Sequence, residues 1–330
     1  MPITSFTSDI ESLTMTVVAD FTAPVERLWD AYLNPRSIEQ FWGPVEYPAT
    51  FFRHDGFVGG LSNYCMTGPN GDTSRGYWKW TAVAEPSRFE VLDGFALEDG
   101  TPNDAMPEMR MVFEFAETAL GSRVTTTTHF NSVEEIEKII GMGMEEGLRS
   151  AMSQIDAVLA DLAELVGVWD TELQLLGTNQ ARISRIVRGP IDAVWRAHTE
   201  PELLRQWQTG PDGWSMPECE MSATEGTSVK YTFRNDESGE TFGFVGEVIE
   251  VETPHRLVST ERFCTPDDPQ GESSPETLNE LTLNSCSSGT LLTYVITYPD
   301  TDTRAEILAT GMVDGMEVSF DRLESRIDTM

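Results

Sequence analysis

Stretches in which apolar and polar residues alternate are interleaved along this chain with stretches of helical period. Residues 13–22 alternate and are rich in Thr and Val, which predicts a β-strand. Pro24 follows at a position that a first helical turn tolerates, and the apolar stripe behind it predicts a helix. Pro35 ends that helix and begins a second short one, which runs to Trp42.

The rest of the first half predicts an antiparallel sheet and one long helix. Gly, Pro, Asn and Asp turns separate the predicted strands near residues 48–53, 60–67, 75–84, 88–96, 108–117 and 122–130. The helix is predicted over residues 133–163, with an inner face made of Ile140, Met144, Leu148, Ile155 and Leu159 or Leu162. The apolar faces of sheet and helix must bury each other, and a twisting sheet that curls around a helix can leave a hollow between them.

The same order of features returns in the second half. At a shift of 166 residues the matching pairs are Pro24 and Pro190, Trp29 and Trp195, Pro35 and Pro201, and Gln40 and Gln206. At a shift of 168 they are Pro86 and Pro254, Arg88 and Arg256, Gly121 and Gly289, Met144 and Met312, and Gly147 and Gly315. Such regular self-similarity indicates a duplicated module.

These patterns predict an α+β fold in two tandem domains. Each is a curved antiparallel sheet wrapped around a long C-terminal helix, with two short helices after the first strand. We expect an N-terminal tail at 1–12, domain 1 at 13–163, a connector at 164–180 and domain 2 at 181–330. The connector is too apolar for a free linker, so we also expect the two domains to pack together.

The acidity of the chain restricts its partners. The formal net charge is -33 and the acidic residues are dispersed, which indicates a solvated acidic surface or, alternatively, attraction of a cationic partner. Nucleic acids and anionic membranes would be repelled, so neither is expected as a partner. No apolar run is long enough to span a membrane and the first residues lack signal-peptide features, so we expect a cytoplasmic protein.

Alternation along the strands predicts which side chains face the hollow. Met, Trp and Phe with a few hydroxyl groups would suit a large, flat, mostly apolar ligand. The alternative for each residue is a filled core, and for the two tryptophans the opposite face, which carries Tyr77, also stays open. The predicted ligand-binding residues are Trp78, Trp80, Met111, Phe113, Thr126, Thr128, Met144, Leu148, Asn279, Leu281, Tyr294, Ile296, Met312 and Met316.

Glycines within the predicted long helix need an explanation, because each costs about 1 kcal/mol relative to alanine. Gly141, Gly143 and Gly147 lie there, and Gly311 and Gly315 lie at the matching place in the second half. Either the sheet approaches the helix closely at these positions, or the missing side chains leave room for a ligand.

Signals of catalysis are weak. The four histidines and four cysteines show no metal-ligand spacing or C-x-x-C pair, and no phosphate, dinucleotide or nucleophile motif occurs. We therefore expect no metal and no cofactor, and leave catalytic residues unassigned. A cyclase would need only a shaped pocket and one or two acid–base groups, for which Tyr64, Glu114, His129 and Tyr294 are candidates.

Several motifs carry a family resemblance. The first half contains DGFVGGLSNYCMTGPNGD from Asp55, FWGP from Phe41, EPSRFEV and MEEGLRSAMSQI, and the second contains TPHRLVS. Together they resemble the START-like (SRPBCC, Bet v 1-like) superfamily, in the branch of activator of heat-shock-protein ATPase homologues. The resemblance implies two tandem helix-grip domains. The second copy departs from it: of the GG-x-x-x-Y run only Gly226 and Tyr231 remain, and CTPDDPQGESSPET is inserted from Cys264. Whether both copies bind the same ligand therefore stays open.

The resemblance implies several functions, since this superfamily includes carriers, polyketide cyclases, receptors, co-chaperones and resistance proteins. The tandem, acidic chain is also similar to START-like proteins of enediyne biosynthetic clusters. Our leading hypothesis is non-catalytic binding of a hydrophobic, polycyclic or polyketide-like small molecule, for biosynthesis, transport or antibiotic resistance by sequestration. The alternatives are a cyclase/aromatase-type enzyme and a co-chaperone-like interaction module.

Overall fold

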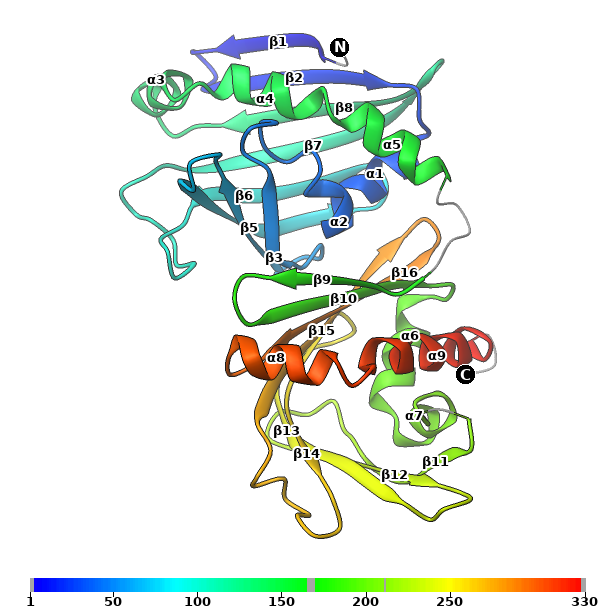
Figure 1. The fold of residues 1–330 in the computed structure, drawn as a ribbon. Helices are drawn as coiled ribbons and strands as arrows, with labels where there is room; N and C mark the ends of the chain where they lie inside the picture. The colour runs from blue at the N-terminus through cyan, green and yellow to red at the C-terminus, as the bar shows by residue number, and fades with distance from the viewer. Residues whose placement is uncertain (1–2, 165–169, 211, 328–330) are drawn as a thin grey trace. The chain divides into compact units, whose positions relative to one another are not determined.

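The structure is a computed structural model that describes residues 3–164, 170–210 and 212–327 (Figure 1). Contacts between Cα atoms divide the chain into two compact units, Met1–Gly167 and Val168–Met330. Among the described residues, no helix has both the length and the apolar character that a bilayer-spanning segment requires.

The first unit is built on one antiparallel sheet. Its strands are β1 Ile3–Asp9, β2 Thr14–Phe21, β3 Ala49–His54, β4 Leu61–Thr67, β5 Thr73–Ala84, β6 Arg88–Phe95, β7 Glu108–Thr118 and β8 Gly121–His129. They are arranged in the order β1-β2-β8-β7-β6-β5-β4-β3. Most neighbours in this sheet are consecutive along the chain, and the β2–β8 pair joins its beginning to its end.

Helices cover one face of this sheet, as Figure 1 shows. The short helices are α1 Val25–Leu33 and α2 Pro35–Ile38, and the closing segment consists of α3 Val133–Gly141, α4 Met144–Met152 and α5 Ile155–Glu164. Helix α1 contacts α5, β7 and β8, so the short helices and the end of the closing segment lie over the same side of the sheet.

The prediction of one uninterrupted closing helix was wrong. The segment breaks at Gly143, whose φ of +86° lies in the left-handed region that favours glycine. The break changes the phase of the apolar stripe: Ile136 and Ile139 are buried, whereas Ile140, predicted to face inward, is 46% exposed. Ile155 and Leu159 are buried as predicted, and the side chain of Leu162 is outside those described.

The predicted helix glycines do not mark close approach of the sheet. A Cβ atom added at Gly141 or Gly315 would meet nothing within 4 Å, and one at Gly147 would lie 3.7 Å from the Pro44 side chain. Close approach of the sheet is therefore contradicted at these positions, and Gly141 is exposed to solvent.

Two segments predicted to lie outside the domains contain strands. Residues 3–9, predicted as a tail, form β1 and pair with β2. In the predicted connector, residues 172–176 form β9, in which Leu176 is fully buried. Both are short edge strands with mostly exposed side chains, so they lack the alternation that reveals a half-buried strand. Residues 165–169 of the connector lie outside the described residues.

The second unit repeats the architecture of the first. Its strands are β9 Glu172–Leu176, β10 Gln180–Val187, β11 Trp214–Glu220, β12 Ser228–Asn235, β13 Thr241–Glu252, β14 Arg256–Cys264, β15 Glu276–Cys286 and β16 Gly289–Thr297. Their order is β11-β12-β13-β14-β15-β16-β10-β9, which is equivalent to that of the first sheet. The helices are α6 Ile191–Thr199, α7 Pro201–Trp207, α8 Thr301–Leu308 and α9 Met312–Glu324. The predicted tandem α+β fold is thus confirmed.

Candidate functional site

The inner face of the first sheet is filled by aromatic side chains. Trp78, Trp80 and Phe113, all predicted ligand-binding residues, are at most 2% exposed and belong to the main core cluster. Phe89 stacks on Phe113 with ring centroids 4.5 Å apart, and its ring lies 4.9 Å from that of Trp80. These rings pack directly against one another, as expected if this face is a filled core.

The other predicted residues of the first unit are divided between two places. Met111, Thr126 and Thr128 are buried on the same face as Phe113 or on the neighbouring strand. Met144, in contrast, is half-buried against a separate cluster that contains Met15, and Leu148 is half-buried on α4. The structure therefore does not gather the predicted residues of the first unit at one site.

An acidic side chain that sequence reasoning missed lies on this aromatic face. Asp93 of β6 accepts hydrogen bonds from Trp78 Nε1 at 2.8 Å and from the Tyr64 hydroxyl at 3.3 Å. Burial raises the pKa of Asp93 to about 7, although both hydrogen bonds act in the opposite direction. A carboxyl group that titrates near neutrality is thus enclosed among aromatic rings.

The second unit has an acid at the equivalent position. Glu261 of β14 lies 168 residues after Asp93, on the inner face of its sheet. Burial raises the pKa of Glu261 to about 7, and a hydrogen bond from the Asn279 side chain opposes this rise. Burial, and then the charge of Glu261, raise the phenol pKa values of Tyr231 and Tyr294, so these groups surround one another.

A neutral histidine completes this polar group. His198 of α6 is 3% exposed and donates from Nδ1 to the Val194 carbonyl oxygen at 2.7 Å. Burial lowers the pKa of His198 to about 4, so the ring is neutral at physiological pH. Its centroid lies 6.3 Å from that of Tyr294. Tyr32 occupies the equivalent place in the first unit, at a shift of 166.

The aromatic side chains that fill the first interior are not repeated around this group. Strands β5 and β13 have the same length and the same bulge position at a shift of 168, and the following strands continue that shift. Five aromatic residues are replaced in this way: Trp78 by Gly246, Trp80 by Val248, Phe89 by Leu257, Phe113 by Leu281 and Phe115 by Leu283. Ala19, Gly76 and Thr126 change in the other direction, to Arg185, Phe244 and Tyr294, so the second interior differs from the first in shape and polarity.

The polar side chains also retain accessible surface. Glu261 and Tyr294 are enclosed deeply enough for burial to dominate their pKa values, yet both side chains are only half-buried by exposed area, as is Asn279. Asp93 of the first unit is likewise deeply enclosed and half-buried, so the two acids share this feature, whereas Asn279 and Tyr294 are particular to the second unit. A mostly apolar site with a few convergent polar groups of shifted pKa is the usual form of a ligand-binding site.

The predicted residues of the second unit gather around these groups. Leu281, Tyr294 and Met316 belong to one core cluster. Ile296 and Met312 belong to an adjoining one, and Tyr294 and Met316 contact both. Asn279 lies on the same face of β15 as Leu281. Here the structure does bring together the residues that alternation placed inward.

Of the four candidate acid–base groups, two lie inside. Tyr64 and Tyr294 are on inner faces, whereas Glu114 is exposed and His129 is half-buried on the outer face of β8. Asp93 and Glu261, the two acids whose pKa burial raises to about 7, were missed. The internal repeat could have revealed them, because the shift of 168 aligns Asp93 with Glu261 on strand positions that face inward.

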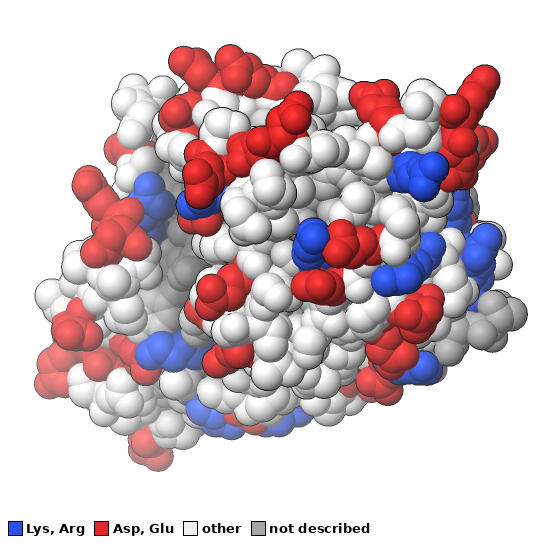
Figure 2. Space-filling model, turned by 90° about the horizontal axis from the view of Figure 1, so that it is seen from below, with Lys and Arg blue, Asp and Glu red and all other residues white. Residues whose placement is uncertain are grey.

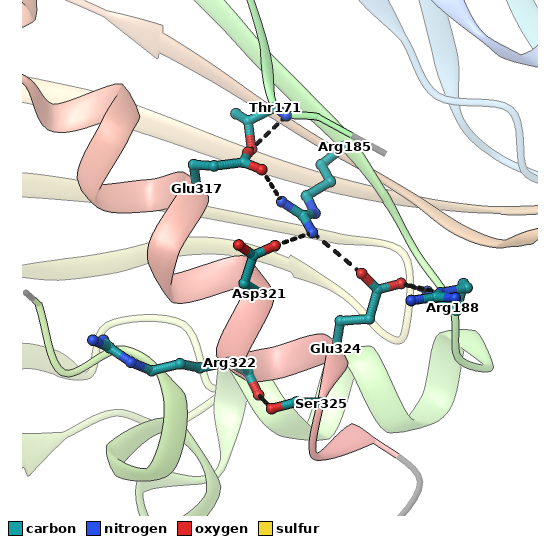
Figure 3. A network of polar contacts seen from close by, with 8 residues as sticks. All are labelled: Thr171, Arg185, Arg188, Glu317, Asp321, Arg322, Glu324 and Ser325. Carbon is teal, nitrogen blue, oxygen red and sulfur yellow. Dashed lines mark hydrogen bonds and ion pairs between the residues drawn. The ribbon is translucent and has the colours of Figure 1, made fainter. Parts of the chain in front are cut away.

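An arginine fixes α9 over the second sheet, and Figure 3 shows three carboxylates turned toward it. Arg185 of β10 is 3% exposed and lies on the same face as Ile183. It donates to Glu317 and Asp321 at 2.6 Å each and to Glu324 at 3.2 Å. We call Arg185 and these three acids the α9 clamp. In the first unit the position of Arg185 is taken by Ala19.

The surface carries most of the negative charge. Figure 2 shows acidic side chains scattered over the face drawn, with Lys and Arg side chains between them.

Within the part of the chain that the structure describes, no group of three His, Cys, Asp or Glu residues is placed to hold a metal ion. The enclosed polar group around Glu261 is therefore the candidate site.

Comparisons with known proteins place the chain in a family. The model of the family described as "Activator of Hsp90 ATPase homolog 1-like protein" matches residues 22–160 and again residues 188–328. No protein of curated function matches.

Solved structures of single-module proteins are also similar. Protein Ms6760 from Mycobacterium smegmatis is 45% identical over 48% of this chain and 97% of its own, with a TM-score of 0.46. A protein from Arthrobacter aurescens is 41% identical over 48% of this chain and 92% of its own, with a TM-score of 0.46. An AHSA1-like protein from Aeromonas hydrophila is 19% identical over 44% and 92%, with a TM-score of 0.35. With both halves matched by the family model, the chain belongs to the Activator of Hsp90 ATPase homolog 1-like family, as two tandem START-like domains.

Proposed function

We propose that this protein binds a hydrophobic, polycyclic or polyketide-like small molecule inside its second unit. The fold of this family is one that binds hydrophobic ligands. The observation that carries the assignment to the second unit is the enclosed, partly accessible group of Glu261, Asn279 and Tyr294 among leucines. The ligand would be held for biosynthesis, transport or self-resistance by sequestration.

The first unit has a supporting role in this proposal. Its inner face is packed with mutually contacting rings such as Trp78, Phe89 and Phe113. Packing of this density leaves a ligand little room without rearrangement. A duplicated module in which one copy keeps the ligand and the other becomes structural accounts for the difference between the two interiors.

Calorimetric titration of the full chain with a panel of polycyclic aromatic compounds tests the proposal. We expect saturable binding of at least one compound at one site per chain, and loss of that binding in Leu281→Phe, which restores the ring found at Phe113. Leu92→Phe is the matched control, because Leu92 lies on the outer face of β6. Absence of binding by every compound, or equal loss in both variants, would overturn the proposal.

A cyclase-type enzyme is the second candidate, and one observation favours it. The pKa of Glu261 is raised to about 7 by burial, which suits a general acid or base at neutral pH. In such an enzyme Glu261 would move a proton while Tyr294 positioned the substrate. Incubation with a poly-β-ketone, followed by mass spectrometry, separates the candidates: a product with one water fewer supports turnover, and unchanged substrate supports binding alone.

A further inference from the structure

Two enclosed acceptor atoms in the second unit have no hydrogen-bond donor. The first is Nε2 of His198. Because Nδ1 donates its proton to the Val194 carbonyl oxygen, Nε2 of the neutral ring carries only a lone pair. This nitrogen is buried and has no partner, and the whole side chain is 3% exposed.

The second acceptor is Oδ1 of Asn279. The amide nitrogen of Asn279 is used in the hydrogen bond to Glu261, which orients the other end of the amide away from the carboxylate. Oδ1 is buried and has no partner. Both acceptors are close to Tyr294: the His198 ring packs against it, and Asn279 stands diagonally across the β15–β16 pair from it.

Nearby protein groups do not explain these two acceptors. Buried polar atoms almost always have a partner, and those that lack one need a reason such as a ligand or an ordered water. Apolar side chains also stand on this face, with Leu281, Leu292 and Ile183 as neighbours of Tyr294. A ligand with an apolar body and its own hydrogen-bond donors would match both the apolar side chains and the two acceptors.

We propose that the second unit takes a flat apolar ligand that carries at least two hydrogen-bond donors, such as phenolic hydroxyls, which bond to His198 Nε2 and Asn279 Oδ1. This inference rests on the proposed function and adds the chemistry of the ligand. The first unit differs at both positions: Met111 replaces the amide of Asn279, and Tyr32 replaces the imidazole of His198 with a hydroxyl that is also buried and without a partner.

A comparison of ligand pairs tests the inference on the unmodified full chain. The probes are a series of dihydroxynaphthalenes and the matching dimethoxynaphthalenes, which keep the apolar body but donate no hydrogen bond. We expect the best dihydroxy compound to bind at least about tenfold more tightly than its dimethoxy counterpart, measured as Kd by calorimetry. Equal affinities would overturn this inference and leave the proposed function standing, whereas no binding by either series would overturn both.

Two variants of the second unit test which residues cause the preference for the dihydroxy compound. Asn279→Met introduces the residue found at Met111, and His198→Phe removes the free nitrogen while keeping a ring. Each is expected to reduce the preference for the dihydroxy compound by about tenfold, with little change in affinity for the dimethoxy compound. Tyr32→Phe is the matched control in the first unit and should leave both affinities unchanged. A preference that survives both second-unit variants, or that is lost in Tyr32→Phe, would overturn the assignment.

Discussion

Asp93 and Glu261 stand 168 residues apart on the inner faces of equivalent strands, and both are enclosed acids with a pKa raised to about 7. Their partners differ. Asp93 is held by two aromatic side chains, Trp78 and Tyr64, in a filled core. Glu261 is held by Asn279, and both acids are half-buried by exposed area. The duplication has kept the acid while the side chains around it have changed.

The raised pKa of Glu261 predicts how stability depends on pH. The enclosed carboxyl keeps its proton up to about 7, whereas in the unfolded chain it loses the proton near 4.5. The folded state is therefore fully stabilised below the unfolded value and loses stability as pH rises through the folded one. In Glu261→Gln this loss is absent, so at about pH 8 the variant should be more stable than the parent by up to roughly 3 kcal/mol.

Urea unfolding at several pH values, read by hydrogen exchange of second-unit peptides, measures this difference. The difference in free energy of unfolding between variant and parent should fall to near zero at about pH 4. Glu247→Gln is the control, because Glu247 is exposed. A gap that does not change with pH would show that Glu261 titrates normally.

The stability of the two units should differ in its sensitivity to changes of side-chain volume. Phe113 is fully buried among rings, so Phe113→Ala should cost about 3–5 kcal/mol of first-unit stability. Leu281→Phe adds volume beside accessible space and should cost less than about 1 kcal/mol, below the usual cost of overpacking a full core. Urea unfolding of both variants measures these costs. A large cost for Leu281→Phe would mean that the second interior is already filled.

The architecture could be predicted because its signals are local and occur twice. Pro24 and Pro190 open equivalent helices, and the alternation around Met111 and Asn279 assigns equivalent sides of two strands. The tandem fold followed from these features. Ile140 was placed wrongly because a helical period extends only as far as the helix does, and the helix breaks at Gly143.

The site was predicted less completely. Alternation indicates the side of a strand, but it does not tell whether neighbouring side chains fill the space there, so Trp78 and Leu281 were treated alike. Asp93 and Glu261 were missed because an acid at an inward position contradicts the apolar pattern that was used to find inward positions. His198 could not be assigned because its role depends on which ring nitrogen the Val194 carbonyl engages.

The α9 clamp predicts a large effect of removing one arginine. Arg185→Met leaves Glu317 and Glu324 without their buried counter-ion and should destabilise α9 by about 2–3 kcal/mol. The value is below that of a fully buried pair because Asp321 is largely exposed. Arg188→Met, at an exposed position bonded to the same Glu324, should cost less than about 1 kcal/mol. Hydrogen exchange of α9 amides would show equal effects in the two variants if the clamp were unimportant.

The break in the closing segment predicts opposite effects for two neighbouring glycines. Gly141→Ala lies in a helix with open space around it and should stabilise the first unit by about 0.5–1 kcal/mol. Gly143→Ala puts a side chain at a φ of +86° and should destabilise it by about 1 kcal/mol. Thermal unfolding of the two variants provides the test. Stabilisation by both substitutions would indicate that the closing helix is continuous in solution.

Methyl-resolved NMR of the full chain with a bound dihydroxynaphthalene tests the central claim most directly. The claim is that the ligand space lies between sheet and helix of the second unit only. Nuclear Overhauser contacts should run from ligand protons to the methyl groups of Leu281 and Met316, and none should reach Met111 of the first unit. Contacts to Met111 instead, or to neither interior, would contradict the account.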